Sequence, residues 1–70
     1  MESLQVGDRV SFTEHGKVFR GEVKHIFMRK NFLDEYIFWV DVEYFRVNAV
    51  RRESFTQLAL KSMEFEVIYR

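Results

Sequence analysis

Residue types that carry out chemistry are scarce in this 70-residue sequence. It has two histidines, His15 and His25, and no cysteine. Without cysteine the chain can form no disulfide, no thiolate nucleophile and no cysteine-ligated zinc site. Glu14 lies beside His15, but the spacing fixes no third ligand for a metal ion. We therefore expect no metal site.

Other patterns of catalysis and cofactor binding are also missing. No serine or threonine lies in the local sequence of a nucleophile elbow or a catalytic triad. The chain has only three glycines, and none belongs to a loop of the kind that cradles phosphates. A domain of this size rarely encloses a substrate in a deep cleft. The sequence predicts a protein that is not an enzyme and that holds no cofactor.

The charged residues balance in number but not in position. Eleven basic and eleven acidic residues give zero net charge, which is unlike a protein that holds nucleic acid by bulk charge. Basic residues dominate positions 15–30, and acidic residues dominate positions 31–45. One hypothesis is that neighbouring strands pair these charges, with Lys24 or Arg20 opposite the acids at 41 and 43. The other is a basic edge that binds single-stranded nucleic acid beside aromatic rings. The candidates for that edge are Lys24, Arg29, Lys30, Arg51 and Arg52.

Two large apolar side chains, Phe32 and Leu33, are adjacent in residues 29–35, the first stretch without alternating polarity. One alternative is that one of them folds back as a lid over the core. The other is that both point outward and form an apolar anchor ringed by charge, as in partner-binding surfaces. With Trp39 as a third candidate, these residues form the predicted partner-binding set.

Alternation of polar and apolar residues predicts the elements that position these side chains. Five strands are expected, at residues 9–13, 18–28, 36–45, 46–52 and 62–70. The spacing of apolar residues in 53–60 predicts a short helical turn before the last strand. Gly21 and the change of phase between Val23 and Ile26 predict a bulge or sharp bend in the second strand.

Three of the connections between the expected strands contain residues that predict their conformation or position. Gly16 is expected at positive φ in the first turn. Asn31 is expected to cap a single helical turn, with Asp34 at its third position. The turn between the third and fourth strands is placed near Asn48 or just before it.

Several of these residues together form a family pattern. They are Val6-Gly7-Asp8-Arg9-Val10, Gly16, Gly21-Glu22-Val23, Ile26, Val40-Asp41-Val42-Glu43-Tyr44, Val50 and Glu53-Ser54-Phe55. Over residues 6–58 the chain resembles SH3-like barrels of the Tudor and KOW kind. The resemblance implies a mainly β fold in which residues 1–70 form one five-stranded SH3-like barrel domain, with one short helical turn before the last strand.

The sequence also departs from both families. The stretch Glu43-Tyr44-Phe45-Arg46 lacks the glycine of the Tudor turn, and the first hairpin is less glycine-rich than in KOW motifs. The resemblance is therefore carried over for the fold, and not for methyl-lysine or ribosome binding.

The function expected is that of a small non-catalytic module that binds another protein. The first alternative is nucleic-acid binding through the basic edge, and the second is a homodimer in which the last strand or an exposed edge pairs with its counterpart. No window is long and apolar enough for a transmembrane helix, and no signal peptide is visible. We expect a cytoplasmic protein of bacterial or phage origin that does not bind membranes.

Overall fold

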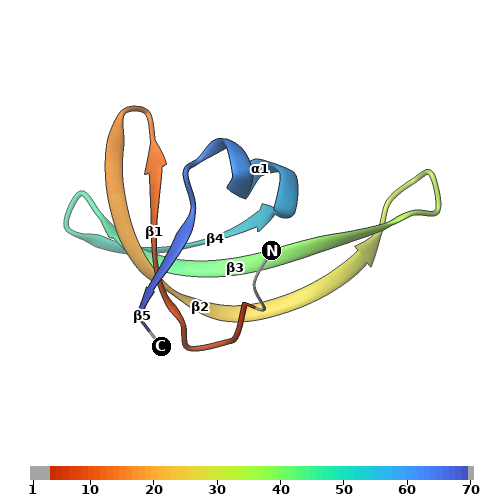
Figure 1. Cartoon of the computed structure of the whole chain (residues 1–70), viewed down its shortest axis with the longest axis horizontal. Helices are drawn as coiled ribbons and strands as arrows, with labels where there is room; N and C mark the ends of the chain where they lie inside the picture. The colour runs from red at the N-terminus through yellow and green to blue at the C-terminus, as the bar shows by residue number, and fades with distance from the viewer. Residues whose placement is uncertain (1–3, 70) are drawn as a thin grey trace.

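A computed structural model describes residues 4–69 of the chain. The elements are β1 (Arg9–Glu14), β2 (Lys17–Lys30), β3 (Tyr36–Arg46), β4 (Ala49–Thr56), α1 (Gln57–Ser62) and β5 (Glu66–Tyr69). The strands form one antiparallel sheet in the order β4-β3-β2-β1-β5 (Figure 1). The prediction of a mainly β fold with a short helix before the last strand is confirmed. The sheet is not closed, because β4 and β5 are its two edges.

β2 is long enough to pair with two neighbouring strands. Its first part pairs with β1, from Lys17 to Glu22, and its second part pairs with β3, from Gly21 to Lys30. A Cβ atom on Gly21 would lie 2.6 Å from the Glu43 carbonyl oxygen, so only glycine allows this approach of β2 to β3. The register shifts between Val23 and His25, which confirms the predicted bulge. Together the glycine and the bulge let β2 bend as it passes from one partner to the other.

The core lies on one face of the bent sheet, the inner face. Alternation places one apolar set of each strand there, and the helix adds Leu60 from above (Figure 1). Phe12 is 1% exposed, and its ring centroid lies 5.0–5.8 Å from those of Phe19, Tyr44 and Phe55. The buried hydrophobic residues are Val10, Phe12, Val23, Val40, Val42, Tyr44, Phe55 and Leu60.

The short turns follow the sequence signals. Gly16 has φ 76° as predicted, and His15 before it has φ 53°. Val47 and Asn48 form the turn between β3 and β4, with φ 52° and 59°. Two successive residues at positive φ match the right-handed twist of the flanking strands. The predicted position of the β3–β4 turn is confirmed, although the turn contains no glycine.

The predicted boundaries near the C-terminal end were wrong in part. Residues 53–56 belong to β4 rather than to a helix, because Glu53 and Phe55 continue the pairing opposite Val42 and Val40. The helix begins only after Thr56, whose hydroxyl accepts a hydrogen bond from the Ala59 backbone N–H at 3.1 Å. The helix ends at Ser62, and a turn at residues 63 and 64 follows it, so β5 begins only at Glu66. Arg70 lies outside the described residues.

The fourth strand and the β2–β3 loop also differ from the prediction. Arg46 ends β3, and the fourth strand begins three residues later, at Ala49, because the turn occupies positions 47 and 48. The predicted helical turn after Asn31 is absent, since residues 32–34 form turns and a bend instead.

The β2–β3 hairpin extends beyond the rest of the sheet, as the right-hand side of Figure 1 shows. The last pair between β3 and β4 is Trp39 with Thr56, and β1 reaches only Glu22 of β2. The pairs from Met28–Phe38 to Lys30–Tyr36 therefore have no further strand on either side within the described chain. We call residues 28–38 the distal hairpin. In residues 4–69 no helix has the length and apolar character needed to cross a membrane.

Candidate functional site

The loop of the distal hairpin is closed by one side chain, that of Asn31. Its Oδ1 atom accepts hydrogen bonds from the backbone N–H groups of Leu33 and Glu35, at 2.9 and 3.0 Å. The backbone N–H of Asn31 donates to the Glu35 carbonyl at 2.9 Å, and Lys30 Nζ lies 3.0 Å from Asp34 Oδ1. Asn31 thus uses its short polar side chain to satisfy a turn rather than to begin a helix. The loop is held in one shape before any partner arrives.

Phe32 and Leu33 point outward from this closed loop. The side chain of Phe32 is 95% exposed and that of Leu33 is 63% exposed. Of the two alternatives for this pair, the structure has both side chains at the surface and neither over the core. Two adjacent exposed apolar side chains at the end of a projecting hairpin form the kind of anchor that another surface can bury.

The inner face of the distal hairpin is also apolar and uncovered. Met28, Tyr36 and Phe38 are in phase with the core residues of β2 and β3, but Met28 and Tyr36 are exposed, because β4 pairs with β3 only as far as Trp39 and β1 reaches only Glu22 of β2. Leu58 of α1 is 79% exposed at the base of the hairpin. Here lies a hollow of about 340 Å³, which we call the recess; it is lined by Tyr36, Ile37, Phe38, Thr56, Gln57 and Leu58.

Sequence reasoning missed these inner-face residues. The alternation in β2 and β3 assigns Met28 and Tyr36 to the same face as the core, and the pattern itself gives no sign that the covering elements end earlier. A signal for Leu58 did exist, because it stands one position before the half-buried Ala59 and two before the buried Leu60 of a six-residue helix. A helix that short can bury only one side of its surface.

Trp39 lies on the opposite, outer face of the hairpin. It pairs with Phe27 across the two strands, and the rings stack with an interplanar angle of 6° and a centroid distance of 6.3 Å. Phe27 in turn stacks with His25 at 5.2 Å, and the Arg29 guanidinium lies 5.6 Å above its ring. The structure thus does not join Trp39 to the apolar inner face; its stacking with Phe27 braces the hairpin from the other side.

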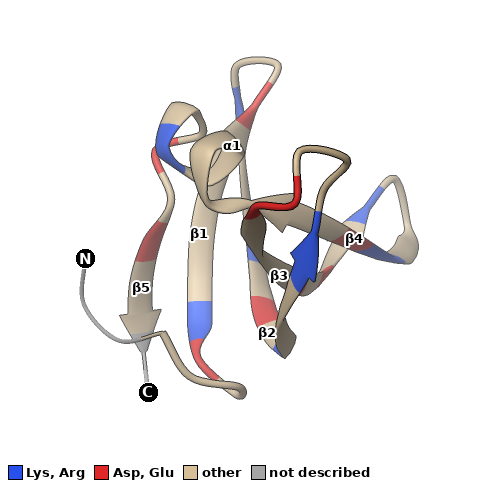
Figure 2. Cartoon of the chain, turned by 90° about the vertical axis from the view of Figure 1, so that its right-hand side faces the viewer, with Lys and Arg blue, Asp and Glu red and all other residues tan. Residues whose placement is uncertain are grey.

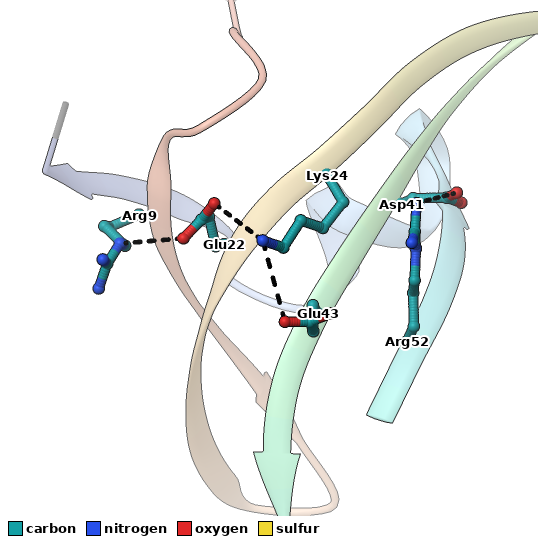
Figure 3. Close-up of polar contacts among 6 residues, drawn as sticks. All are labelled: Arg9, Glu22, Lys24, Asp41, Glu43 and Arg52. Carbon is teal, nitrogen blue, oxygen red and sulfur yellow. Dashed lines mark hydrogen bonds and ion pairs between the residues drawn. The ribbon is translucent and has the colours of Figure 1, made fainter. Parts of the chain in front are cut away.

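Most of the basic residues singled out from the sequence are paired with acids. Lys24 lies between Glu22 and Glu43, with Nζ–Oε distances of 3.1 and 3.9 Å, and Arg52 lies 3.7 Å from Asp41 (Figure 3). The predicted cross-strand pairing is confirmed for Lys24 with Glu43. Figure 2 shows positive and negative segments interspersed along the strands.

The remaining basic candidates do not converge on one surface. Lys30 is bound to Asp34, and Arg29 covers Phe27 on the outer face. Arg51 is exposed and lies on the inner side opposite Tyr44, far along the sheet from the hairpin loop. Exposed ion pairs of this kind stabilise a fold by only about 0.2–1 kcal/mol each, but they do neutralise the charge that a polyanion would need.

The histidines lie apart from each other. His15 is in the first turn, 3.8 Å from a Glu14 oxygen, and His25 is in the aromatic stack of β2. In the part of the chain that the structure describes, no three His, Asp or Glu side chains gather in a group that could hold a metal ion.

No protein-family model, curated protein or solved structure matches this chain. What the distal hairpin does must therefore be inferred from its own geometry and chemistry.

Proposed function

We propose that this chain is a small non-catalytic module that binds another protein through its distal hairpin. The single observation that carries the proposal is the 95% exposure of Phe32 at the end of a hairpin that extends past its neighbouring strands. A fully exposed large apolar side chain gains about 1.5–3 kcal/mol when a partner buries it. Phe32 and Leu33 act as the anchors, and the apolar inner face beneath them enlarges the contact.

Two further features of the hairpin favour the binding of a partner. Asn31 already holds the loop closed, so little conformational entropy is lost when a partner binds. The loop also carries charges of both signs around the anchors, from Arg29 and Lys30 to Asp34 and Glu35. Such a ring of charge contributes to the choice of partner and to the rate of association.

The scaffold proposed is an SH3-like barrel whose two edge strands remain apart. The strand order β4-β3-β2-β1-β5 and the short helix between β4 and β5 support this assignment, together with the bent second strand. The same fold class serves many unrelated functions, so the assignment adds nothing to the choice of partner.

A comparative capture experiment tests the proposed function. Tagged chains are used to capture proteins from cells that encode the sequence, in three forms: unchanged, Phe32→Ser with Leu33→Ser, and Val47→Asn. Val47 is the matched control, because it is an apolar residue, 84% exposed, in a different turn. We expect at least one captured protein whose retention falls more than about tenfold with the double variant and with neither of the other two forms. An untagged copy of the chain itself counts as such a protein. Circular dichroism checks that all three forms are folded.

Two results would overturn the proposal. One is an identical set and amount of captured proteins for all three forms. The other is capture of nucleic acid alone, released as salt rises and lost in Arg29→Glu, which would favour the alternative of a nucleic-acid-binding surface.

A further inference from the structure

The distal hairpin carries two apolar features that complement each other. Its end presents an anchor, Phe32 with Leu33, and its base presents the recess of about 340 Å³ beside Phe38 and Leu58. The anchor belongs to the hairpin alone, and the recess lies between the hairpin, the end of β4 and α1 of the same chain. A surface that contains both a projection and a hollow can bind a second copy of itself across a two-fold axis. The projection of each copy then fills the hollow of the other.

The pairing register of the hairpin fits such an arrangement. The recess extends along β3 from Tyr36 to Phe38, and its inner end lies at the Met28–Phe38 pair, two pairs inward from Lys30–Tyr36. Phe32 and Leu33 lie two and three residues outward from Lys30. A two-fold axis that crosses the strands above the inner face, over the Lys30–Tyr36 pair, would reverse the strand direction and bring the anchor of one copy over the inner end of the recess of the other, at about 3.3 Å per residue.

The basic side chain at this axis does not oppose the arrangement. Two Lys30 residues would approach each other there, but each has its Nζ 3.0 Å from its own Asp34 and 5.4 Å from the centre of its own Tyr36 ring. The carboxylate neutralises the charge, and the aromatic face accommodates the ammonium group.

The charges at the two ends are complementary. The loop that carries the anchor includes the exposed acid Glu35, next to Asp34, which is already paired with Lys30. The recess is bordered by α1, where Leu58 and Lys61 are three residues apart and so lie on the same side of the helix. In the two-fold arrangement Glu35 of one loop would approach Lys61 of the other copy, which is exposed.

The available area is also of the required size. Five apolar side chains of the distal hairpin and α1 are 60–95% exposed: Met28, Phe32, Leu33, Tyr36 and Leu58. Taking about 150–250 Å² for a fully exposed large side chain, they present on the order of 700 Å². A standard stable interface buries about 800 Å² on each partner, and the flanking polar atoms add to the apolar area.

We propose that the partner of the distal hairpin is a second copy of this chain, with Phe32 of each copy seated in the recess of the other beside Leu58. This inference rests on the proposed function and names the protein that the hairpin binds. It places the dimer contact on the hairpin and α1, and leaves the free edges of β4 and β5 outside it.

Sedimentation equilibrium gives the first test. At about 100 µM the unchanged chain is expected to have a mass near twice 8.6 kDa, and to dissociate on dilution. Phe32→Ser is expected to weaken association by more than about tenfold, and so is Leu58→Ser from the other side of the contact. The Val47→Asn control is expected to associate like the unchanged chain. A monomer at every concentration, or a dimer that survives both serine substitutions, would overturn the inference.

Disulfide trapping tests the geometry, because the chain has no cysteine of its own. The single variants Phe32→Cys and Leu58→Cys are mixed in a glutathione redox buffer, in which random disulfides exchange. We expect the 32–58 link to dominate over the 32–32 and 58–58 links, and a Val47→Cys variant to form no preferred link with either. Predominance of 32–32 links would contradict the arrangement.

The two proposals fail separately. If the chain is monomeric but the double variant loses a captured protein, the hairpin binds a different protein and only the self-association is wrong. If the chain is dimeric through other surfaces and the capture experiment shows no change, both are wrong.

Discussion

Tyr44 is the side chain whose chemistry depends most on its surroundings. Its hydroxyl donates a hydrogen bond to Glu53 Oε1 at 2.6 Å, and its ring packs edge-on against Phe12 in the core. Burial raises the pKa of the Tyr44 hydroxyl above its ordinary value, and the carboxylate of Glu53 adds to the effect. Arg46 acts in the opposite direction, but the net shift is upward. The folded state therefore favours the protonated phenol.

This shift predicts how the stability contribution of Tyr44 depends on pH. Because the pKa is higher in the folded than in the unfolded chain, the contribution is complete below the unfolded value of about 10 and is lost as pH rises above it. Tyr44→Phe is expected to lower the free energy of unfolding by about 1 kcal/mol at neutral pH, since Glu53 loses its donor. Urea unfolding from about pH 8 to about pH 11 measures both forms. A difference between them that stays constant over that range would contradict the assignment.

Among the elements, the β3–β4 turn is strained and the β2–β3 loop is not. Val47 has φ 52°, a conformation that costs a β-branched residue about 1–2 kcal/mol. In the β2–β3 loop the positive φ belongs to Asp34, a residue type that tolerates it, and Asn31 satisfies the backbone. The loop that carries the anchor therefore holds less backbone strain than the β3–β4 turn.

Removing the strain at Val47 is expected to stabilise the chain. Val47→Asn places a residue that accepts positive φ at an 84% exposed site, so little buried area is lost. The free energy of unfolding should rise by about 1 kcal/mol. Asn48→Val, which puts a second β-branched residue at positive φ, should lower it by a similar amount. Urea midpoints of the three forms check the prediction, and an unchanged or lower midpoint for Val47→Asn would contradict it.

At the scale of the whole molecule, one small core has to support a projecting hairpin. The core uses one face of the sheet and Leu60 of the helix, while the distal hairpin receives no cover from either neighbour strand. A chain of this size has a stability of roughly 3.5–10 kcal/mol, at about 0.05–0.15 kcal/mol per residue. Its exposed apolar residues therefore contribute little to folding and remain available for binding.

This division predicts opposite outcomes for two phenylalanines. Phe12→Ala removes a ring that contacts three others in the core, and is expected to cost about 3–5 kcal/mol, enough to leave much of the chain unfolded. Phe32→Ala removes a ring that is 95% exposed and should change stability by less than about 0.5 kcal/mol. Thermal unfolding followed by circular dichroism compares them. A large loss in Phe32→Ala would mean that the hairpin end belongs to the core.

Much of the architecture could be predicted because it depends on local patterns. The bulge after Val23 follows from a change of phase in the sequence, and the turns at Gly16 and Asn48 follow from residue type and strand length. The helix position was harder, because Glu53 and Phe55 fit a helical spacing as well as a strand. Only their pairing with β3 decides between the two.

The sequence alone determined which residues of β3 share a face, and it singled out Phe32 and Leu33 as the candidate anchor. It did not do so for β2, where Phe19 rather than Val18 packs on the core. Alternation is a local property, since successive side chains of a strand must point to opposite sides. The tertiary structure alone decided that Met28 and Tyr36, in phase with the core, are exposed, and it decided between the two hypotheses for Lys24 in favour of pairing with acids. The exposure and the ion pairing of a side chain depend on where the neighbouring strands end. A local sequence pattern does not predict this, because those strands are remote in sequence.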